Sequence, residues 1–299
     1  MADSYLRVRL DALRKAQNPD GGWGYFPGKQ SWLEPTAYAA LALTGTPPAD
    51  RAWALLSGWQ AGDGGWRPSA DVRMSTWGTA LCVTLASARG DFGEPYQRGV
   101  TWLLASAGVE TNAVNRLMSR VGLIDLERDL NFKAWPWNPG ATSWVEPTAH
   151  ALIALKKAAL RPGGKHVSDI EERIRMGEAQ LLNVRCSDGG WNYGSRAALG
   201  VNLSSYPETT ALALLGLQGR AGIGASVDLA ARLFSDSGSS SLAHAWLSVA
   251  LRLHGVSPAD AAAPQPSPDL SITALEALAA PDGNYSLLKT DWVETGAST

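Results

Sequence analysis

Two kinds of helical pattern alternate along this chain. The first has an apolar stripe and a polar face: Leu6, Leu10 and Leu13 recur at helical spacing, with charged residues between them. Helices of this kind are expected to keep one face in solvent. Segments with this pattern are 5–17, 50–60, 95–107, 168–185 and 227–235, with a weaker one near 257–263. The second kind, as in 36–45 and 210–219, is rich in alanine and leucine on every side, so it must be covered by protein.

The apolar helices begin with related sequences, most of them containing Thr-Ala, which recur roughly every 45 residues. These starts are 32–37, 75–80, 144–149, 206–211, 240–245 and 269–274. In such repeats each unit buries its apolar surface against its neighbours, and a closed ring leaves no apolar end exposed. The pattern therefore predicts an all-α fold, an (α/α)6 toroid of six outer and inner helix pairs, as one domain over 1–299.

Glycine and tryptophan mark the connections from outer to inner helices. Asp-Gly-Gly-Trp occurs at 20–23, 63–66 and 188–191, and a related Asp-Gly-Asn-Tyr at 282–285. Glycine allows the backbone turn that ends a helix and aspartate bonds within that turn, so we interpret these loops as structural. The far longer connection at 109–143 contains a short amphipathic helical pattern, and we expect either a lid or a packing insertion there.

Composition narrows the class of protein. An apolar content of 45% and a mean hydropathy of -0.10 suit a globular chain, and no apolar run is long enough to span a bilayer. The N-terminus lacks the layout of a secretory signal, so we expect a cytoplasmic protein. A net charge of -2 with scattered basic residues argues against nucleic-acid binding. Cys82 and Cys186 lack metal-ligand spacing and are expected to be free thiols.

The Asp-Gly-Gly-Trp loops and Thr-Ala helices together resemble the prenyltransferase and squalene-cyclase repeat family over nearly the whole chain. The resemblance implies a toroid whose central, aromatic-lined cavity holds isoprenoid chains. Class II terpene cyclases of this family protonate their substrate with the middle Asp of an Asp-x-Asp-Asp motif before Thr-Ala. Glu34, Glu146 and Glu208 occupy that middle position here, but the flanking residues are not acidic and no Asp-x-Asp-Asp occurs.

These three glutamates are candidate acids, with a structural alternative. Glutamate in the first turn of a helix is favoured by the helix dipole, and this role needs no chemistry. Burial would raise the carboxyl pKa and the helix start would lower it, so the sequence leaves the protonation state open. His150 lies one turn after Glu146 and is a further candidate catalytic residue, with a buried core histidine as the alternative.

The prenyltransferase branch of the family implies a zinc ion held by Asp-x-Cys and His, which this sequence does not match. Cys186 precedes Asp188 in a glycine loop, and Cys82 lies within a helix with no Asp two residues before it. We therefore expect no metal and no cofactor.

Aromatic residues near the inner-helix starts favour ligand binding. Aromatic faces attract cations, although aromatic side chains at helix ends are also common packing residues. With His244, which replaces Thr in the fifth repeat, the candidate substrate-binding residues are Trp32, Trp77, Trp144, Tyr206, Trp246, Trp135 and Trp137.

Two hypotheses follow. In the first, the protein is a metal-free cyclase or isomerase in which a glutamate donates a proton and tryptophans stabilise the cation. In the second, it is a non-catalytic toroid that binds an isoprenoid, a peptide or a protein. We favour an isoprenoid or another apolar small molecule as the ligand. Peripheral membrane contact and the oligomeric state stay open.

Overall fold

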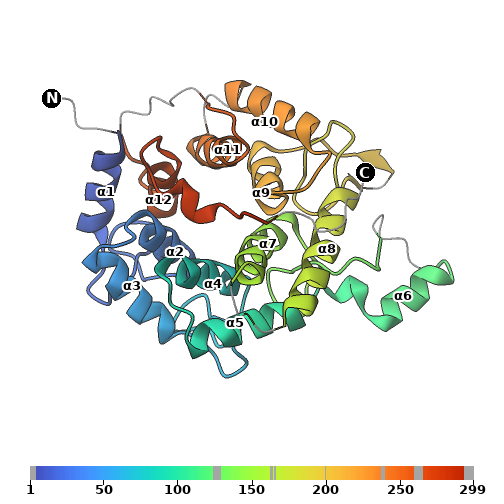
Figure 1. Ribbon diagram of the computed structural model, residues 1–299, viewed down its shortest axis with the longest axis horizontal. Helices are drawn as coiled ribbons and strands as arrows, with labels where there is room; N and C mark the ends of the chain where they lie inside the picture. Colours follow the sequence, from blue (N-terminus) through green and yellow to red (C-terminus); the bar gives the residue numbers. More distant parts are fainter. Residues whose placement is uncertain are drawn as a thin grey trace.

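The computed structural model describes residues 5–123, 129–161, 164, 166–198, 200–236, 240–258 and 265–292. Six apolar helices form an inner ring (Figure 1), and each packs against the next. They are α2 (Leu33–Ala42), α4 (Gly78–Arg89), α7 (Val145–Ala159), α9 (Pro207–Gly216), α11 (Ser241–Leu253) and α12 (Leu270–Ala279). Because α12 also packs against α2, the ring is closed, as the repeat predicts.

Amphipathic helices surround this ring on the outside. They are α1 (Tyr5–Ala16), α3 (Pro47–Ser57), α5 (Glu94–Ala105), α8 (Val167–Asn183) and α10 (Gly224–Asp236). Each covers one or two inner helices, and α1 packs against α12, so the first outer helix covers the last inner one. The predicted outer helix near 257–263 lies outside the described residues except for its first two positions.

The remaining elements are short. Strand β1 (Ala197–Ala198) pairs with strand β2 (Val201–Asn202) in antiparallel register. The 109–143 insertion contains a 3-10 turn, η1 (Val109–Thr111), followed by α6 (Ala113–Arg120). A second 3-10 turn, η2 (Tyr285–Leu288), follows α12. The mostly helical architecture confirms the predicted all-α toroid.

Small residues allow the inner helices to approach one another closely. A Cβ atom placed on Gly216 of α9 would lie 2.9 Å from the Cα of Ala149 in α7, closer than such contacts allow. The alanine and leucine composition of the inner ring is therefore a packing requirement, because larger side chains would push the helices apart.

The loop tryptophans join the two rings. Trp23 is fully buried; its indole Nε1 donates to the carbonyl oxygen of Leu13 at the end of α1, over 2.8 Å. Its backbone N–H donates to Thr36 Oγ1 of α2, over 2.9 Å. Trp66 and Trp191 make the equivalent pairs of bonds in their own repeats. These loops therefore have the structural role that the sequence indicated.

Candidate functional site

The starts of the inner helices meet at one end of the ring, which we call the mouth. Four loop residues there, each two positions after a loop tryptophan or its equivalent, accept a backbone hydrogen bond from the start of an inner helix. The acceptor and donor pairs are Tyr25 and Leu270, Pro68 and Leu33, Trp137 and Trp77, and Tyr193 and Val145. Because Tyr25 and Leu270 come from opposite ends of the chain, this set of bonds also ties the ring closed.

Glu34 and Glu146 occupy the same position in the first turns of α2 and α7, and both side chains are half-buried. The two carboxyl groups lie close enough for the charge of Glu34 to raise the pKa of Glu146. The hydroxyl of Tyr25 donates to Glu34 Oε2 over 2.7 Å. Glu208, at the start of α9, accepts a hydrogen bond from Ser240 Oγ over 3.2 Å. Burial raises the pKa of Tyr193, and the charges of Glu208 and Glu146 raise it further, so Glu208 lies around the mouth with the other two glutamates.

Burial raises the pKa of the carboxyl groups of Glu34 and Glu146, whose protonation state the sequence left open. The pKa of Glu146 is raised to about 8, first by burial and then by the negative charge of Glu34. Burial also raises the pKa of Glu34, and the hydrogen bond from Tyr25 opposes this shift. Glu146 therefore keeps its proton at neutral pH despite its position at a helix start.

Below the glutamates, three rings meet at the axis of the ring of helices. Tyr38, His150 and Trp246 are each at most 3% exposed, and their ring centroids lie 5.6 to 6.1 Å apart. Tyr38 Oη and His150 Nε2 are hydrogen-bonded over 3.1 Å. Burial lowers the pKa of His150 to about 3, so this imidazole is neutral. We call these three residues the aromatic floor of the mouth.

The floor residues occupy one repeat position. Each lies two residues after the Thr position of its inner helix, in the first, third and fifth repeats. The second, fourth and sixth repeats carry leucine there, at Leu81, Leu212 and Leu275. Large rings from alternate helices thus alternate with leucines, which lets three large side chains share the narrow axis.

The other predicted ligand-binding residues fall into two groups. The rings of Trp77 and His150 are tilted against each other, with centroids 5.3 Å apart, and Trp137 meets Trp77 edge-on at 5.0 Å. Trp77 and Trp137 therefore belong to the mouth. Trp32, Trp144 and Tyr206 lie at the N-caps of inner helices; Trp144 is 38% exposed and Tyr206 45% exposed. These five aromatic residues form the rim and upper wall of the mouth.

Trp135 and His244 do not join this group. Trp135 is 2% exposed, its Nε1 donates to Leu103 O over 2.8 Å, and its N–H donates to Thr148 Oγ1. These are the bonds of a loop tryptophan, so Trp135 is the structural tryptophan of the third repeat. His244 turns toward the outer ring and packs against Phe234 of α10, with ring centroids 4.7 Å apart.

Sequence reasoning missed Tyr25, Tyr38 and Tyr193. Tyr25 and Tyr193 stand two residues after Trp23 and Trp191, so their place in the repeat was a usable signal. In the described part of the chain, no cluster of three or more His, Cys, Asp or Glu side chains could hold a metal ion.

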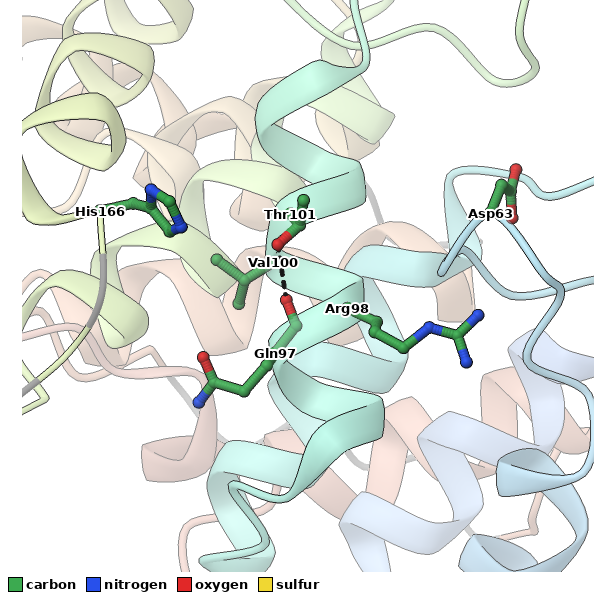
Figure 2. Close-up of a pocket in the computed structure, with 6 residues that line it drawn as sticks. All are labelled: Asp63, Gln97, Arg98, Val100, Thr101 and His166. Atoms are coloured by element: carbon green, nitrogen blue, oxygen red, sulfur yellow. Dashed lines mark hydrogen bonds between the residues drawn. The ribbon is translucent and has the colours of Figure 1, made fainter.

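A separate pocket of about 250 Å³ lies on the outside of the ring, along α5 (Figure 2). It is lined by Asp63, Gln97, Arg98, Val100, Thr101 and His166. Asp63 accepts hydrogen bonds from Ser75 Oγ and Trp102 Nε1, and Arg98 donates to two backbone carbonyl oxygens of the neighbouring loop. Since these charged groups already serve the loop structure, we assign the pocket no function.

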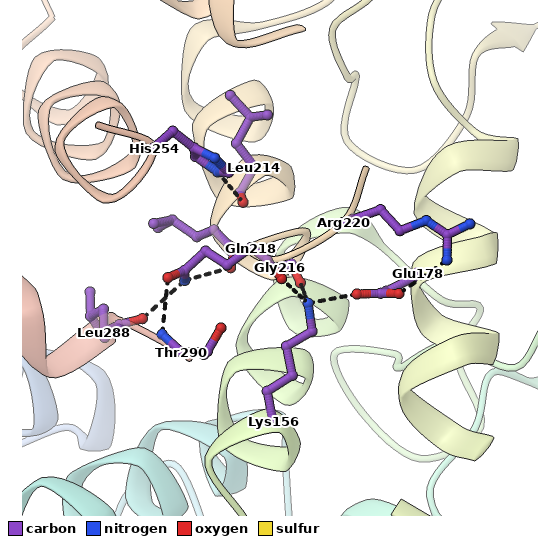
Figure 3. Close-up of polar contacts among 10 residues, drawn as sticks. Lys156, Glu178, Leu214, Gly216, Gln218, Arg220, His254, Leu288 and Thr290 are labelled. Atoms are coloured by element: carbon purple, nitrogen blue, oxygen red, sulfur yellow. Dashed lines mark hydrogen bonds and ion pairs between the residues drawn. The ribbon is translucent and has the colours of Figure 1, made fainter. Parts of the chain in front are cut away.

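The end of the ring opposite the mouth is closed by polar contacts (Figure 3). Lys156, at the end of α7, is fully buried and lies 2.6 Å from Glu178 of α8. Its Nζ also donates to two backbone carbonyl oxygens at the end of α9. The side chain of Gln218 binds the backbone of Leu288 and Thr290, so residues 288–290 are held across this end.

The comparisons with known proteins concern the fold. No known family model and no curated protein matches the chain. The structure of type II terpene cyclase MstE from Scytonema is 20% identical, with a TM-score of 0.54 over 92% of this chain and 76% of the cyclase. A variant of that cyclase in complex with its substrate geranylgeranyl dihydroxybenzoate gives 18% identity and a TM-score of 0.53, over 92% and 75% of the two chains. The chain therefore has a class II terpene cyclase-like fold.

The same architecture also occurs in a carbohydrate-binding protein. A variant of Rex8A from Paenibacillus barcinonensis, complexed with 3(3)-alpha-L-arabinofuranosyl-xylotetraose, is 10% identical, with a TM-score of 0.56 over 97% of this chain and 94% of that one. At such identities the likeness shows the fold alone. Function must therefore be argued from the residues of the mouth.

Proposed function

We propose that the protein is an acid-catalysed isoprenoid cyclase or isomerase in which Glu146 donates the proton. The observation that carries this proposal is the position of Glu146, which is half-buried in the first turn of α7 at the mouth, close to Glu34. Burial and the charge of Glu34 raise the pKa of this carboxyl group to about 8, which favours its protonated form at neutral pH. A general acid must hold its proton until the substrate arrives, and burial provides this at Glu146.

The proposed reaction balances without any co-reactant. The Glu146 proton passes to one carbon of an alkene, whose neighbouring carbon becomes a cation and leaves Glu146 as a carboxylate. The cation then loses a proton from another carbon, directly or after ring closure, and that proton restores the Glu146 carboxyl group. The product is an isomer of the substrate.

The aromatic residues support this chemistry electrostatically. Trp77 and the rings of Tyr38 and Trp246 lie below and beside the glutamates, where a substrate cation would form. An aromatic face attracts a cation by roughly 0.5 kcal/mol at an exposed site and by about 2 kcal/mol where the cation is desolvated. Glu34, held by Tyr25, adds a carboxyl group next to the donor, so Glu34 is proposed as a positioning and charge-stabilising residue.

The aromatic floor favours the alternative function, binding without catalysis. Tyr38, His150 and Trp246 fill the axis below the glutamates, so a ligand would rest in the mouth between the rim residues. The exposed rings of Trp144 and Tyr206 offer an apolar surface for an isoprenoid, a peptide or a protein segment.

Incubation with isoprenoid alcohols and diphosphates of ten to thirty carbons in D2O separates the two functions. We expect the wild type to form an isomer that carries deuterium, and Glu146→Gln to abolish this product. Glu94→Gln is the matched control, because Glu94 also precedes a proline in the first turn of a helix but lies exposed on the outer ring.

Each other outcome is informative. Equal conversion by Glu34→Gln, Glu146→Gln, Glu208→Gln and the wild type would disprove the acid assignment. Saturable binding of an isoprenoid with no conversion by the wild type would establish the non-catalytic function.

A further inference from the structure

The three glutamates of the mouth differ in what their carboxyl groups bind. Glu34 accepts a hydrogen bond from the hydroxyl of Tyr25 over 2.7 Å, and Glu208 accepts one from Ser240 Oγ over 3.2 Å. Within the described residues, no group donates a hydrogen bond to the carboxyl group of Glu146. Glu146 is thus distinguished from the other two by its lack of a donor in this part of the chain.

The repeat explains why Glu146 differs from Glu34. Tyr25 stands nine residues before Glu34, in the loop that leads to α2. The residue nine positions before Glu146, in the loop that leads to α7, is Trp137. Trp137 therefore occupies the position from which a tyrosine donates in the first repeat, and its indole ring has no hydroxyl group.

The backbone makes the same connection at both positions. The carbonyl oxygen of Tyr25 accepts the N–H of Leu270 over 2.7 Å, and that of Trp137 accepts the N–H of Trp77 over 3.0 Å. Leu270 begins α12 and Trp77 is the N-cap of α4, so each donor lies at the start of the inner helix that precedes in the ring. The two loops thus differ here in the side chain and not in the course of the main chain.

The ring of Trp137 contacts the neighbouring repeat. It meets the ring of Trp77 edge-on, with centroids 5.0 Å apart and an angle of 87° between the planes, a geometry in which aromatic rings attract each other. The ring of Tyr25, by contrast, lies 6.4 Å from that of Trp32 in its own repeat. Trp77 stands at the glutamate position of the second repeat, so this repeat supplies a ring for Trp137 where the first and third supply a carboxyl group.

The missing hydroxyl affects which carboxyl group keeps its proton. A hydroxyl that donates to a carboxylate stabilises the charged form, so a carboxyl group without such a donor releases its proton less readily. We propose that Trp137 is a positioning residue that makes Glu146, and not Glu34, the proton donor of the mouth, because it replaces the tyrosine that would bind Glu146. The role of proton donor rests on the proposed function, whereas the difference in hydrogen bonding does not.

Other titratable groups of the mouth must be included in any titration of Glu146. They are Glu34 and Tyr38 of α2, Glu208 of α9, His150 of α7 itself, and Tyr25 and Tyr193 of the loops. Burial raises the pKa of each of these tyrosines and lowers that of His150, so all four are neutral near pH 7. The neighbouring α4 brings the uncharged ring of Trp77. Glu34 and Glu208 are therefore the charges to follow beside Glu146.

Two variants that differ by one hydroxyl group test the proposal. Trp137→Tyr gives the third repeat the residue of the first, and Trp137→Phe is the matched control without the hydroxyl. Carbon-13 NMR titration of the glutamate side chains measures the acid dissociation constant of Glu146. This constant should be about tenfold larger in Trp137→Tyr than in Trp137→Phe, because a donor to a carboxylate favours ionisation.

The reciprocal change in the first repeat gives an independent measurement. Tyr25→Phe removes the donor of Glu34 and should raise the pKa of that carboxyl group above its wild-type value. The double variant Tyr25→Phe with Trp137→Tyr moves the hydroxyl from one glutamate to the other, so Glu146 should then ionise before Glu34. Since the two substitutions lie in different loops, a failure of the Trp137 variants to fold leaves the Tyr25 measurement intact.

The pH dependence of conversion separates this role from packing. In the deuterium assay, the pH at which isomer formation falls to half should lie about one unit lower in Trp137→Tyr than in Trp137→Phe. Loss of the ring contact with Trp77 would lower conversion by the same factor at every pH and leave this midpoint in place. If the wild type converts no isoprenoid, the proposed function fails, while the NMR titration still decides the role of Trp137.

Two results would overturn the proposal. One is an equal acid dissociation constant for Glu146 in Trp137→Tyr and Trp137→Phe, with both variants shown to be folded by circular dichroism. The other is a pKa of Glu34 that Tyr25→Phe leaves unchanged, since a tyrosine at this repeat position would then have no influence on the glutamate nine residues later.

Discussion

Helix α7 carries an ionisable side chain near each of its two ends, and the surroundings of the two side chains have opposite effects on their charge. Lys156, at the closed end, is fully buried, lies 2.6 Å from Glu178 and donates to two backbone carbonyl oxygens. Glu146, at the mouth, has no cation beside it among the described residues, and its pKa is raised. The charge of Lys156 is thus compensated by its neighbours, which stabilises the fold. The carboxylate form of Glu146 is disfavoured by its surroundings, which is typical of functional sites.

The largest effect is expected at the closed end. Glu178→Gln leaves the ammonium group of Lys156 buried without its counter-charge, which typically costs about 3 kcal/mol or more of unfolding free energy. Urea denaturation measures this loss. Glu172→Gln, on the exposed side of α8, is the control and should change stability little. A loss below about 1 kcal/mol in Glu178→Gln would mean that the two backbone carbonyl oxygens satisfy Lys156 by themselves.

The next largest effect on stability is expected at the mouth, where a substitution should raise the unfolding free energy at high pH. The folded-state pKa of Glu146 is about 8, above its ordinary value of 4.5. The stabilisation that the folded protein gains from the protonated Glu146 carboxyl group is therefore fully present below about pH 4.5. It is lost as the pH rises through about 8, where the buried group ionises. Since Glu146→Gln cannot ionise, this variant should exceed the wild type at pH 9 by roughly 2 kcal/mol, after allowance for partial solvent access.

Thermal or urea unfolding at pH 5, 7 and 9 checks this expectation. The control Glu94→Gln should keep the wild-type dependence on pH. Equal slopes for Glu146→Gln and the wild type between pH 5 and 9 would contradict the raised pKa, and with it the basis of the proposed acid.

A smaller effect is expected in the aromatic floor. Tyr38→Phe leaves His150 Nε2 without its hydrogen-bond partner in a buried site, which should cost about 1 kcal/mol. Because His150, with a pKa of about 3, is neutral throughout pH 5 to 9, this loss should not vary with pH in that range. Unfolding of Tyr38→Phe at pH 5 and at pH 9 measures this loss of unfolding free energy. The control is Tyr206→Phe, since Tyr206 is exposed. A loss that changes with pH would show that His150 titrates.

The ring of helices could be predicted because its information is local and repeated. The Thr-Ala starts fixed where the inner helices begin, for example α7 at Val145 and α9 at Pro207. The apolar composition then fixed which helices lie inside. Trp135 was predicted to bind ligand, and in the structure it makes the two bonds of a loop tryptophan. The repeat carried this signal, since the separation of 13 residues between Trp135 and Thr148 equals that between Trp23 and Thr36.

The chemistry of the mouth could be predicted only in part. The repeat position of Glu34 and Glu146 singled them out as candidate acids. Their protonation depends on how deeply the surrounding protein buries them, which no local sequence pattern records. The pair of Lys156 and Glu178 was missed for a similar reason, since it joins an apolar helix to an outer helix through tertiary packing alone.

The smallest expected effect is the electrostatic coupling between the carboxyl groups of Glu34 and Glu146 at the mouth. The pKa of Glu146 is raised first by burial and second by the charge of Glu34. Glu34→Gln removes only the second cause, so the pKa of Glu146 should fall below about 8 and stay above 4.5. Carbon-13 NMR titration of the glutamate side chains measures both values. A pKa for Glu146 that does not move would show that the two carboxyl groups titrate independently, whereas a fall to 4.5 would make Glu34, and not burial, the reason that the mouth holds a proton.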